Sequence, residues 1–137
     1  MTAERQVFPA RTDALTQVCT FVETRCAALG VGRPATLLLT LMAEELFINT
    51  VVHGYGNDGR RSVELSIRDC GSEVELVAED DAPEFNPFDG TPPEAPAAGQ
   101  VGGYGRLLLK GLSSRQSYHR RGKRNCVIVG VQKNRLS

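Results

Sequence analysis

The sequence has no excess of either charge. Sixteen Lys and Arg balance sixteen Asp and Glu among its 137 residues, which gives a formal net charge of zero at pH 7. A protein that binds nucleic acid or an anionic membrane over a broad surface usually carries a basic excess. We therefore expect no direct binding of nucleic acid, and any charged ligand must be held by a local arrangement of side chains.

The sequence also lacks the apolar segments that direct a protein to a membrane. Its opening segment, MTAERQVFPARTDAL, has no apolar core typical of a signal peptide. No later stretch approaches the roughly 18 apolar residues that are needed to span a bilayer. These absences predict a cytoplasmic protein that does not associate with a membrane.

Closely spaced cysteine pairs are missing as well. The C-x-x-C spacing typical of zinc sites and redox pairs does not occur among the four cysteines, so we expect reduced thiols. The length suits a single domain, residues 1–137, with one core and one main site.

The periodicity of apolar residues predicts two long helices behind a short strand. The expected elements are a strand at 5–9, a helix at about 13–29 and a helix at about 34–53. Thr12 or Asp13 can cap the first helix, and Pro34 suits the first turn of the second. The turn-rich segment GYGNDG then ends the second helix.

Alternating apolar and polar residues predict two strand pairs in the rest of the chain. The expected elements are strands at 61–68, 73–79, 114–119 and 125–131 and a short helix at 106–112. Residues 80–99 are rich in proline, so they form neither a regular helix nor a central strand. This order predicts an α+β fold, a two-layer α/β sandwich in which helices cover one face of a mostly antiparallel sheet.

Glu45, Asn49 and His53 are spaced four residues apart on the second predicted helix. This spacing places them in one polar stripe on a helix whose other residues are mostly apolar. A carboxylate and a carboxamide one turn apart suit a magnesium ion, and Glu45 can equally orient or deprotonate a hydroxyl group. The alternative is a stripe that faces solvent, with His53 serving in packing or capping.

An acidic segment, EDDAPEFNP, follows directly on a predicted strand. A carboxylate at a strand end can accept a hydrogen bond from an exocyclic amine. Phe85 and the neighbouring prolines can form an apolar wall for a flat ring. The alternative is a solvated acidic turn.

A glycine cluster, Gly102-Gly103-Tyr104-Gly105, precedes the last predicted helix. Glycines let backbone amides approach a phosphate closely, and a helix start favours an anion. The cluster is not a P-loop, because no Gly-Lys-Ser/Thr follows it. The alternative is a flexible lead into the helix.

The order of these motifs resembles that of the GHKL (Bergerat-fold) ATPases. More closely, segments along nearly the whole chain are similar to the small stand-alone anti-sigma factor serine kinases of bacteria: EELFINTVVHGY, EDDAPEFNPF and GGYGRLLLKGLSSRQSYHRRGKRNCVIV. In that family the kinase uses ATP to phosphorylate a serine on an anti-sigma-factor antagonist. The same kinase, often as a homodimer, can sequester a sigma factor, which implies a role in transcription regulation.

The resemblance implies ATP or ADP and Mg²⁺ as ligands and assigns roles to residues of this chain. Glu45 would be the catalytic base and Asn49 the magnesium ligand, while Asp80 would bind the adenine amine. An ATP lid would span about 88–101. The other residues expected at the nucleotide are Ala82, Phe85, Gly102, Gly103, Tyr104 and Gly105.

A basic segment near the C-terminus offers a docking surface for an acidic partner. It contains Arg115, Arg120, Arg121, Lys123 and Arg124, of which residues 120–124 are expected at a hairpin tip. The alternative is a solvated tip without a partner.

Two residues depart from the family's Asp-x-Gly-x-Gly turn, because Ala82 and Glu84 stand at its glycine positions. If the first position needs a left-handed backbone, Ala82 costs about 1 kcal/mol and loosens the nucleotide pocket. The alternative function is therefore a non-catalytic partner-binding module of the same fold, with weakened or lost nucleotide binding. A detached sensor-kinase ATPase domain is less favoured, since we expect no phosphoacceptor helix before the domain.

Overall fold

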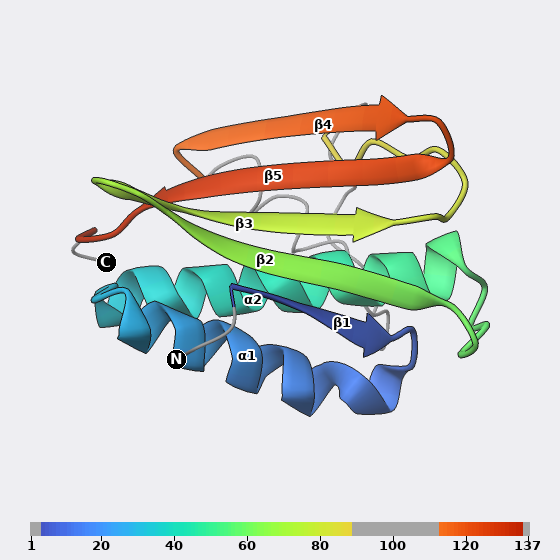
Figure 1. The fold of residues 1–137 in the computed structure, drawn as a ribbon, viewed down its shortest axis with the longest axis horizontal. Helices are drawn as coiled ribbons and strands as arrows, with labels where there is room; N and C mark the ends of the chain where they lie inside the picture. The colour runs from blue at the N-terminus through green and yellow to red at the C-terminus, as the bar shows by residue number, and fades with distance from the viewer. Residues whose placement is uncertain (1–3, 89–112, 136–137) are drawn as a thin grey trace, which may run out of the picture.

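Within residues 4–88 and 113–135, a five-stranded antiparallel sheet forms one layer of the fold, and two α-helices lie against one of its faces (Figure 1). This computed structural model describes residues 4–88 and 113–135. The strands are β1 (Arg5–Pro9), β2 (Ser62–Cys70), β3 (Glu73–Asp80), β4 (Arg115–Arg121) and β5 (Arg124–Gln132). Their order is β1-β2-β3-β5-β4, which confirms the predicted α+β sandwich with helices on one face. The helix expected at 106–112 lies outside the described residues.

The helical layer begins with a short 3₁₀ turn and ends with a π-helical turn. Its elements are η1 (Thr12–Ala14), α1 (Leu15–Ala28), α2 (Arg33–Asn49) and the π-helical η2 (Thr50–Gly54). The predicted cap at Thr12 or Asp13 is wrong, because neither helix start has a side-chain cap. The carboxylate of Asp13 instead accepts hydrogen bonds from Arg11 Nε and Nη2, at 3.1 and 2.8 Å.

The hairpin of β4 and β5 has a shorter tip than predicted. Arg121 and Arg124 are direct register partners at the ends of the two strands, so the turn itself contains only Gly122 and Lys123. Gly122 has a φ of 61°, a left-handed conformation that glycine adopts without strain. Three of the five residues expected at the tip therefore belong to strands, where their side chains can reach neighbouring elements.

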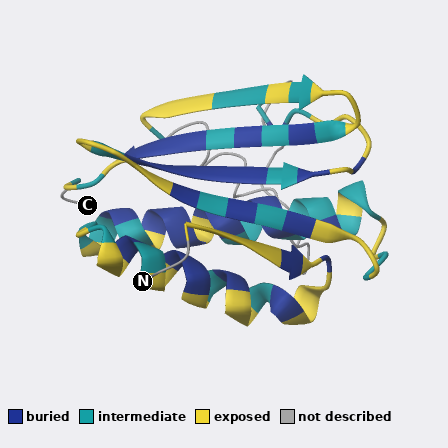
Figure 2. Cartoon of the chain, in the orientation of Figure 1, coloured by how far each residue is buried: buried dark blue, intermediate teal, exposed yellow. Residues whose placement is uncertain are grey.

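The core lies between the sheet and the helices, and β3 and β5 in the middle of the sheet are its most buried strands (Figure 2). Phe8 of β1 makes edge-to-face ring contacts with Phe21 of α1 and Phe47 of α2, at 5.7 and 6.4 Å between ring centroids. These contacts join the first strand to both helices. The largest fully buried side chains come from both layers: Phe8, Phe47, Leu39, Met42, Leu65, Ile67, Leu76, Val18, Val22, Val51 and Val63.

The helical stretch Arg33–Gly54 is long and apolar enough to cross a membrane by length and composition alone. The expectation that no stretch approaches this length is therefore wrong. Half of its most apolar window is buried inside the fold, where it packs on the sheet and on α1. Such burial is what the central helix of a two-layer sandwich requires.

Candidate functional site

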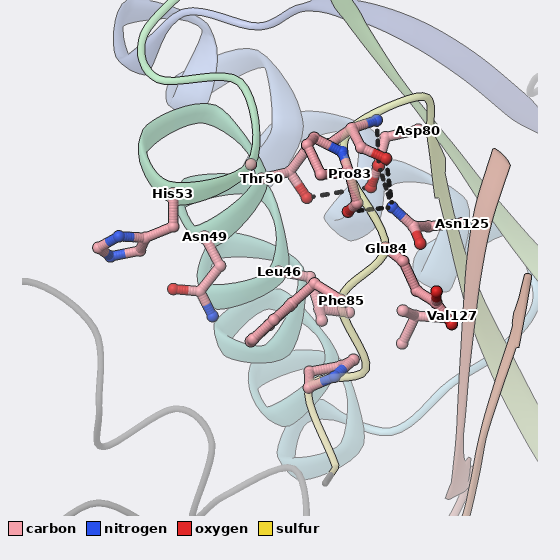
Figure 3. A pocket seen from close by; sticks show the side chains of 13 residues that line it. Leu46, Asn49, Thr50, His53, Asp80, Pro83, Glu84, Phe85, Asn125 and Val127 are labelled. Atoms are coloured by element: carbon pink, nitrogen blue, oxygen red, sulfur yellow. Dashed lines mark hydrogen bonds between the residues drawn. The ribbon is translucent and has the colours of Figure 1, made fainter. Parts of the chain in front are cut away.

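A cavity of about 190 Å³ opens between the end of α2 with η2 and the adjoining ends of β3 and β5 (Figure 3). The helix supplies polar groups on one side, and the turn after β3 supplies the opposite wall. The lining residues are Leu46, Asn49, Thr50, His53, Gly54, Asp80, Ala82, Pro83, Glu84, Phe85, Pro87, Asn125 and Val127. Four of the residues expected at a nucleotide, Asn49, Asp80, Ala82 and Phe85, therefore lie around one cavity.

The helical side of the cavity comes from the passage of α2 into a π turn. The amide of Tyr55 donates to the carbonyl of Thr50 at 2.8 Å, a five-residue step that widens the helix at this point. Figure 3 shows Asn49 and His53 on the same side of the helix, while Thr50 points towards Asp80. The polar stripe predicted from the sequence therefore faces the cavity at two of its residues, Asn49 and His53.

Glu45 lies one turn before Asn49 and is half-buried, but it does not line the cavity. The Asn49 Nδ2 group donates to Glu45 Oε1 at 3.1 Å, as the four-residue spacing allows. This bond fixes the amide so that Asn49 Oδ1 is the oxygen left to accept or coordinate.

Asp80, the last residue of β3, is 7% exposed and accepts three hydrogen bonds. Its Oδ1 accepts from the Ala82 amide at 3.0 Å and from Asn125 Nδ2 at 2.9 Å. Its Oδ2 accepts from Thr50 Oγ1 at 3.2 Å. A carboxylate offers about four acceptor positions, so the described part of the chain leaves one position, on the oxygen that faces Thr50.

Asn125 pairs directly with Asp80 across β3 and β5 and is 3% exposed. Besides Asp80, its Nδ2 donates to the carbonyls of Ala82 and Pro83, at 3.0 and 3.2 Å. Its Oδ1 accepts from the hydroxyl of Tyr118 and from Arg120 Nη1, the latter at 3.0 Å. The turn after Asp80 is therefore bonded through one buried amide to the C-terminal strands.

Ala82 does not carry the strain considered for its position. Among the described residues, Asn57 is the non-glycine residue with a positive φ, so Ala82 lies outside the left-handed region. The side chain of Ala82 is buried, and a Cβ built on Gly54 would lie only 2.9 Å from its Cβ. The backbone cost of about 1 kcal/mol expected for an alanine in a left-handed turn thus does not arise.

The residues after Ala82 form an apolar wall. Phe85 and Pro87 line the cavity together with Leu46 of α2 (Figure 3). Phe85 is 49% exposed, a large apolar surface for a ring that contacts a cavity. A flat apolar ligand can be held between such groups, as the sequence suggested.

A tyrosine outside the cavity anchors the same turn. The Tyr55 hydroxyl donates to the Ser62 carbonyl and accepts from the Asp81 amide, both at 2.8 Å. Burial raises the pKa of Tyr55, so the hydroxyl keeps its proton for the first of these bonds.

Sequence reasoning missed Thr50 and Asn125, and it left His53 outside the site. A polar residue that opens the otherwise apolar segment NCVIVGV was a signal for Asn125, and Thr50 follows directly on Asn49. The glycine cluster at 102–105, with Tyr104, and nearly all of the expected lid at 88–101 lie outside the described residues. The described part of the site therefore consists of its helical side, the ends of β3 and β5 and the turn after β3.

The basic segment, expected to offer a docking surface, is mostly engaged within the domain. Arg115 pairs with Glu73 and Glu75 at 3.1 and 2.6 Å. Arg120 donates to the Ala82 carbonyl at 2.8 Å. Arg124 pairs with Glu64, Glu79 and Asp81 at 3.2, 3.0 and 3.4 Å. Arg121 and Lys123 are the two exposed members at the hairpin tip.

The residues present fit a magnesium ion that is held mainly by a phosphate ligand. Within residues 4–88 and 113–135, no group of three His, Cys, Asp or Glu is arranged to hold a metal ion. Mg²⁺ commonly takes one or two protein oxygens and completes its shell with phosphate and water. Asn49 Oδ1 is one such oxygen.

The chain belongs to the histidine kinase-like ATPase domain family, whose sequence model matches residues 8–131. This match confirms the resemblance to the GHKL ATPases and defines the class of protein. No protein of curated function matches the chain.

A solved structure shares the fold of this domain. The crystal structure of the RsbU and RsbW domains of Rv1364c from Mycobacterium tuberculosis matches with a TM-score of 0.64 and 15% sequence identity. The match covers 98% of this chain and 34% of that chain, so this chain spans about a third of its length. At this identity the likeness concerns the fold.

Proposed function

We propose that this domain binds ATP with Mg²⁺ and phosphorylates a serine on an anti-sigma-factor antagonist, sequesters a sigma factor, or does both. Membership of the ATPase family and the cavity lined by Asn49, Asp80 and Phe85 support the proposal. The observation that carries it is the acceptor position that the bonds from Thr50, Ala82 and Asn125, within residues 4–88 and 113–135, leave on Asp80 Oδ2, at the end of an apolar pocket.

Asp80 would recognise the base of the nucleotide through a hydrogen bond. The exocyclic amine of adenine donates a hydrogen bond, and the remaining acceptor position of the carboxylate can receive it. The Phe85 ring and Leu46 would contact the faces of the base. We assign the phosphates to the glycine cluster Gly102-Gly103-Tyr104-Gly105, which follows the expected lid in the sequence.

Phosphoryl transfer requires a base for the serine hydroxyl and an oxygen ligand for the metal. Asn49 would hold Mg²⁺, which when bound neutralises charge on the phosphates. Glu45 would accept the hydroxyl proton as the serine oxygen bonds to the γ-phosphorus and the bond to the bridging oxygen breaks, releasing ADP. The bond from Asn49 Nδ2 to Glu45 Oε1 keeps these two groups together.

The partners belong to the same proposal. A sigma factor and an anti-sigma-factor antagonist are the expected proteins, in the cytoplasm, with the domain acting alone or as a homodimer. Arg121 and Lys123 are the exposed cations left at the hairpin tip for an acidic partner.

The test is calorimetric titration of the domain with ADP and with ATP plus Mg²⁺, repeated for Asp80→Asn. Ala82 and Asn125 present two fixed donors, whereas the Thr50 hydroxyl can turn and accept, so the new amide should direct its N–H group towards Thr50 and against the adenine amine. Losing one such bond costs about 1–3 kcal/mol, so affinity should fall about 5- to 150-fold. Folding of the variant is checked by circular dichroism.

The opposite result favours the alternative function. A folded wild-type domain that binds neither nucleotide contradicts the ATP-binding proposal and indicates a partner-binding module. Equal affinities for wild type and Asp80→Asn would place the base elsewhere in the domain.

A further inference from the structure

The turn that follows Asp80 is held by side chains from the C-terminal hairpin. Arg120 of β4 donates from Nη1 to the Ala82 carbonyl at 2.8 Å and to Asn125 Oδ1 at 3.0 Å. Its Nε donates to the Gly122 carbonyl at 3.0 Å, which fixes the guanidinium against its own hairpin. One arginine thus links the hairpin to both the turn and the buried amide of Asn125.

The orientation of the Asn125 amide decides what Asp80 can accept. With Nδ2 directed at Asp80, the amide occupies one position on Oδ1 and leaves Oδ2 to Thr50 and a ligand. A flipped amide would place its oxygen against the Asp80 carboxylate and against the carbonyls of Ala82 and Pro83. Such a flip brings acceptor against acceptor, and it releases the carboxylate from its fixed direction.

Two donors hold the amide in the observed orientation. The Tyr118 hydroxyl and Arg120 Nη1 both reach Asn125 Oδ1. A hydroxyl can turn and become an acceptor, whereas a guanidinium can only donate, so Arg120 is the group that enforces the orientation. A charged donor also makes the stronger bond.

We infer that Arg120 is a positioning residue for base recognition: through Asn125 and the Ala82 carbonyl it holds Asp80 in the orientation that reads the amino group of adenine. Ala82 and Glu84 are not glycines, and the turn that contains them is fixed by contacts such as the bond from Arg120 to the Ala82 carbonyl. This inference rests on the proposed nucleotide-binding function.

The first measurement compares the affinities for ATP and ITP, whose base carries an oxo group in place of the amine. Wild type should prefer ATP, and Arg120→Ala should reduce this preference about tenfold, because a loosened carboxylate no longer distinguishes the two bases. Arg120→Lys keeps the charge but not the forked donors, so its preference for ATP should lie between those of wild type and Arg120→Ala. Arg121→Ala is the matched control, an exposed neighbour on the same strand whose loss should leave the preference unchanged.

A second measurement needs no nucleotide. The Ala82 amide donates to Asp80 Oδ1, and its hydrogen exchange reports how firmly the turn is closed. Exchange at this amide should accelerate about tenfold in Arg120→Ala and stay at the wild-type rate in Arg121→Ala.

The outcomes separate this inference from the proposed function. If wild type binds neither nucleotide, the proposed function fails and so does the assigned role in base recognition, while exchange still shows whether Arg120 closes the turn. If wild type binds ATP and Arg120→Ala weakens ATP and ITP equally, Arg120 only supports the fold and the inference is overturned. An unchanged preference with unchanged exchange overturns it as well.

Discussion

Gly54→Ala places a methyl group where the Ala82 methyl already lies. The new Cβ would be 2.9 Å from the Ala82 Cβ, against about 3.5–4.0 Å for a comfortable carbon contact. Ala82 cannot simply move away, because its amide is bonded to Asp80 and its carbonyl to Arg120 and Asn125. Overpacking of this kind costs about 1–3 kcal/mol, from which the better helix propensity of alanine recovers about 0.5–1 kcal/mol.

The complementary change, Ala82→Gly, should rescue the first. Alone, it removes a buried methyl worth about 0.8 kcal/mol and adds backbone freedom worth about 0.5–1 kcal/mol. In the double variant the methyl on residue 54 has the vacated space beside it, so the strain disappears. We expect the double variant to be more stable than the sum of the single changes by about 1–3 kcal/mol.

Urea unfolding of the four proteins measures this coupling. Gly54 does not have a positive φ, so alanine fits its backbone and the predicted cost arises from the contact alone. If the two single changes in the free energy of unfolding add up to that of the double variant within about 0.5 kcal/mol, the argument is refuted. Residues 54 and 82 would then not be in tight steric contact.

Two further variants test the catalytic assignment and the response to acid. Glu45→Ala should lower serine phosphorylation of an antagonist protein about 10²- to 10⁴-fold while nucleotide affinity changes little. Phosphate transfer at the wild-type rate would remove Glu45 from the role of base, and Glu44→Ala is the control because that neighbour accepts a bond from Cys19 instead. The pKa of Asp69 is held below its ordinary value of 3.8, first by Lys133 and then by the Gly71 amide. Its stabilising contribution is thus present above that value and lost as pH falls through the lower folded pKa. Urea midpoints of Asp69→Asn should therefore fall less than those of wild type between neutral pH and about pH 3, and parallel losses would contradict this.

Local patterns in the sequence predicted the strands and the approach of Glu45 to Asn49, because both depend on spacing within one element. Alternating apolar residues in β3 face a core whatever their partners are. Likewise, a four-residue spacing brings two side chains together on any helix, as the bond from Asn49 to Glu45 shows.

Contacts between distant segments could not be predicted in this way. Asn125 and Asp80 meet across 45 positions because β3 and β5 are neighbours in one register, and nothing local to either residue fixes that register. The contact of Arg120 could not be predicted either. In the sequence this residue is one of a run of basic residues, whereas in the fold it donates to the Ala82 carbonyl. The cap at Thr12 or Asp13 failed for a different reason: both residues lie within the 3₁₀ turn, so Arg11 and Ala14 occupy the cap positions of η1 and α1.

In the last turn of α2 and in η2, some residues pack in the core and their neighbours line the cavity. Phe47 and Val51 are fully buried, while Asn49 and Thr50 between them line the cavity. A ligand held by those polar residues therefore restrains the same segment that anchors the hydrophobic core. By linkage, occupancy at a hundred times the dissociation constant adds about 2.7 kcal/mol to the stability of the folded state. Loss of the ligand would then weaken the core and the site together, because both depend on the same helical segment.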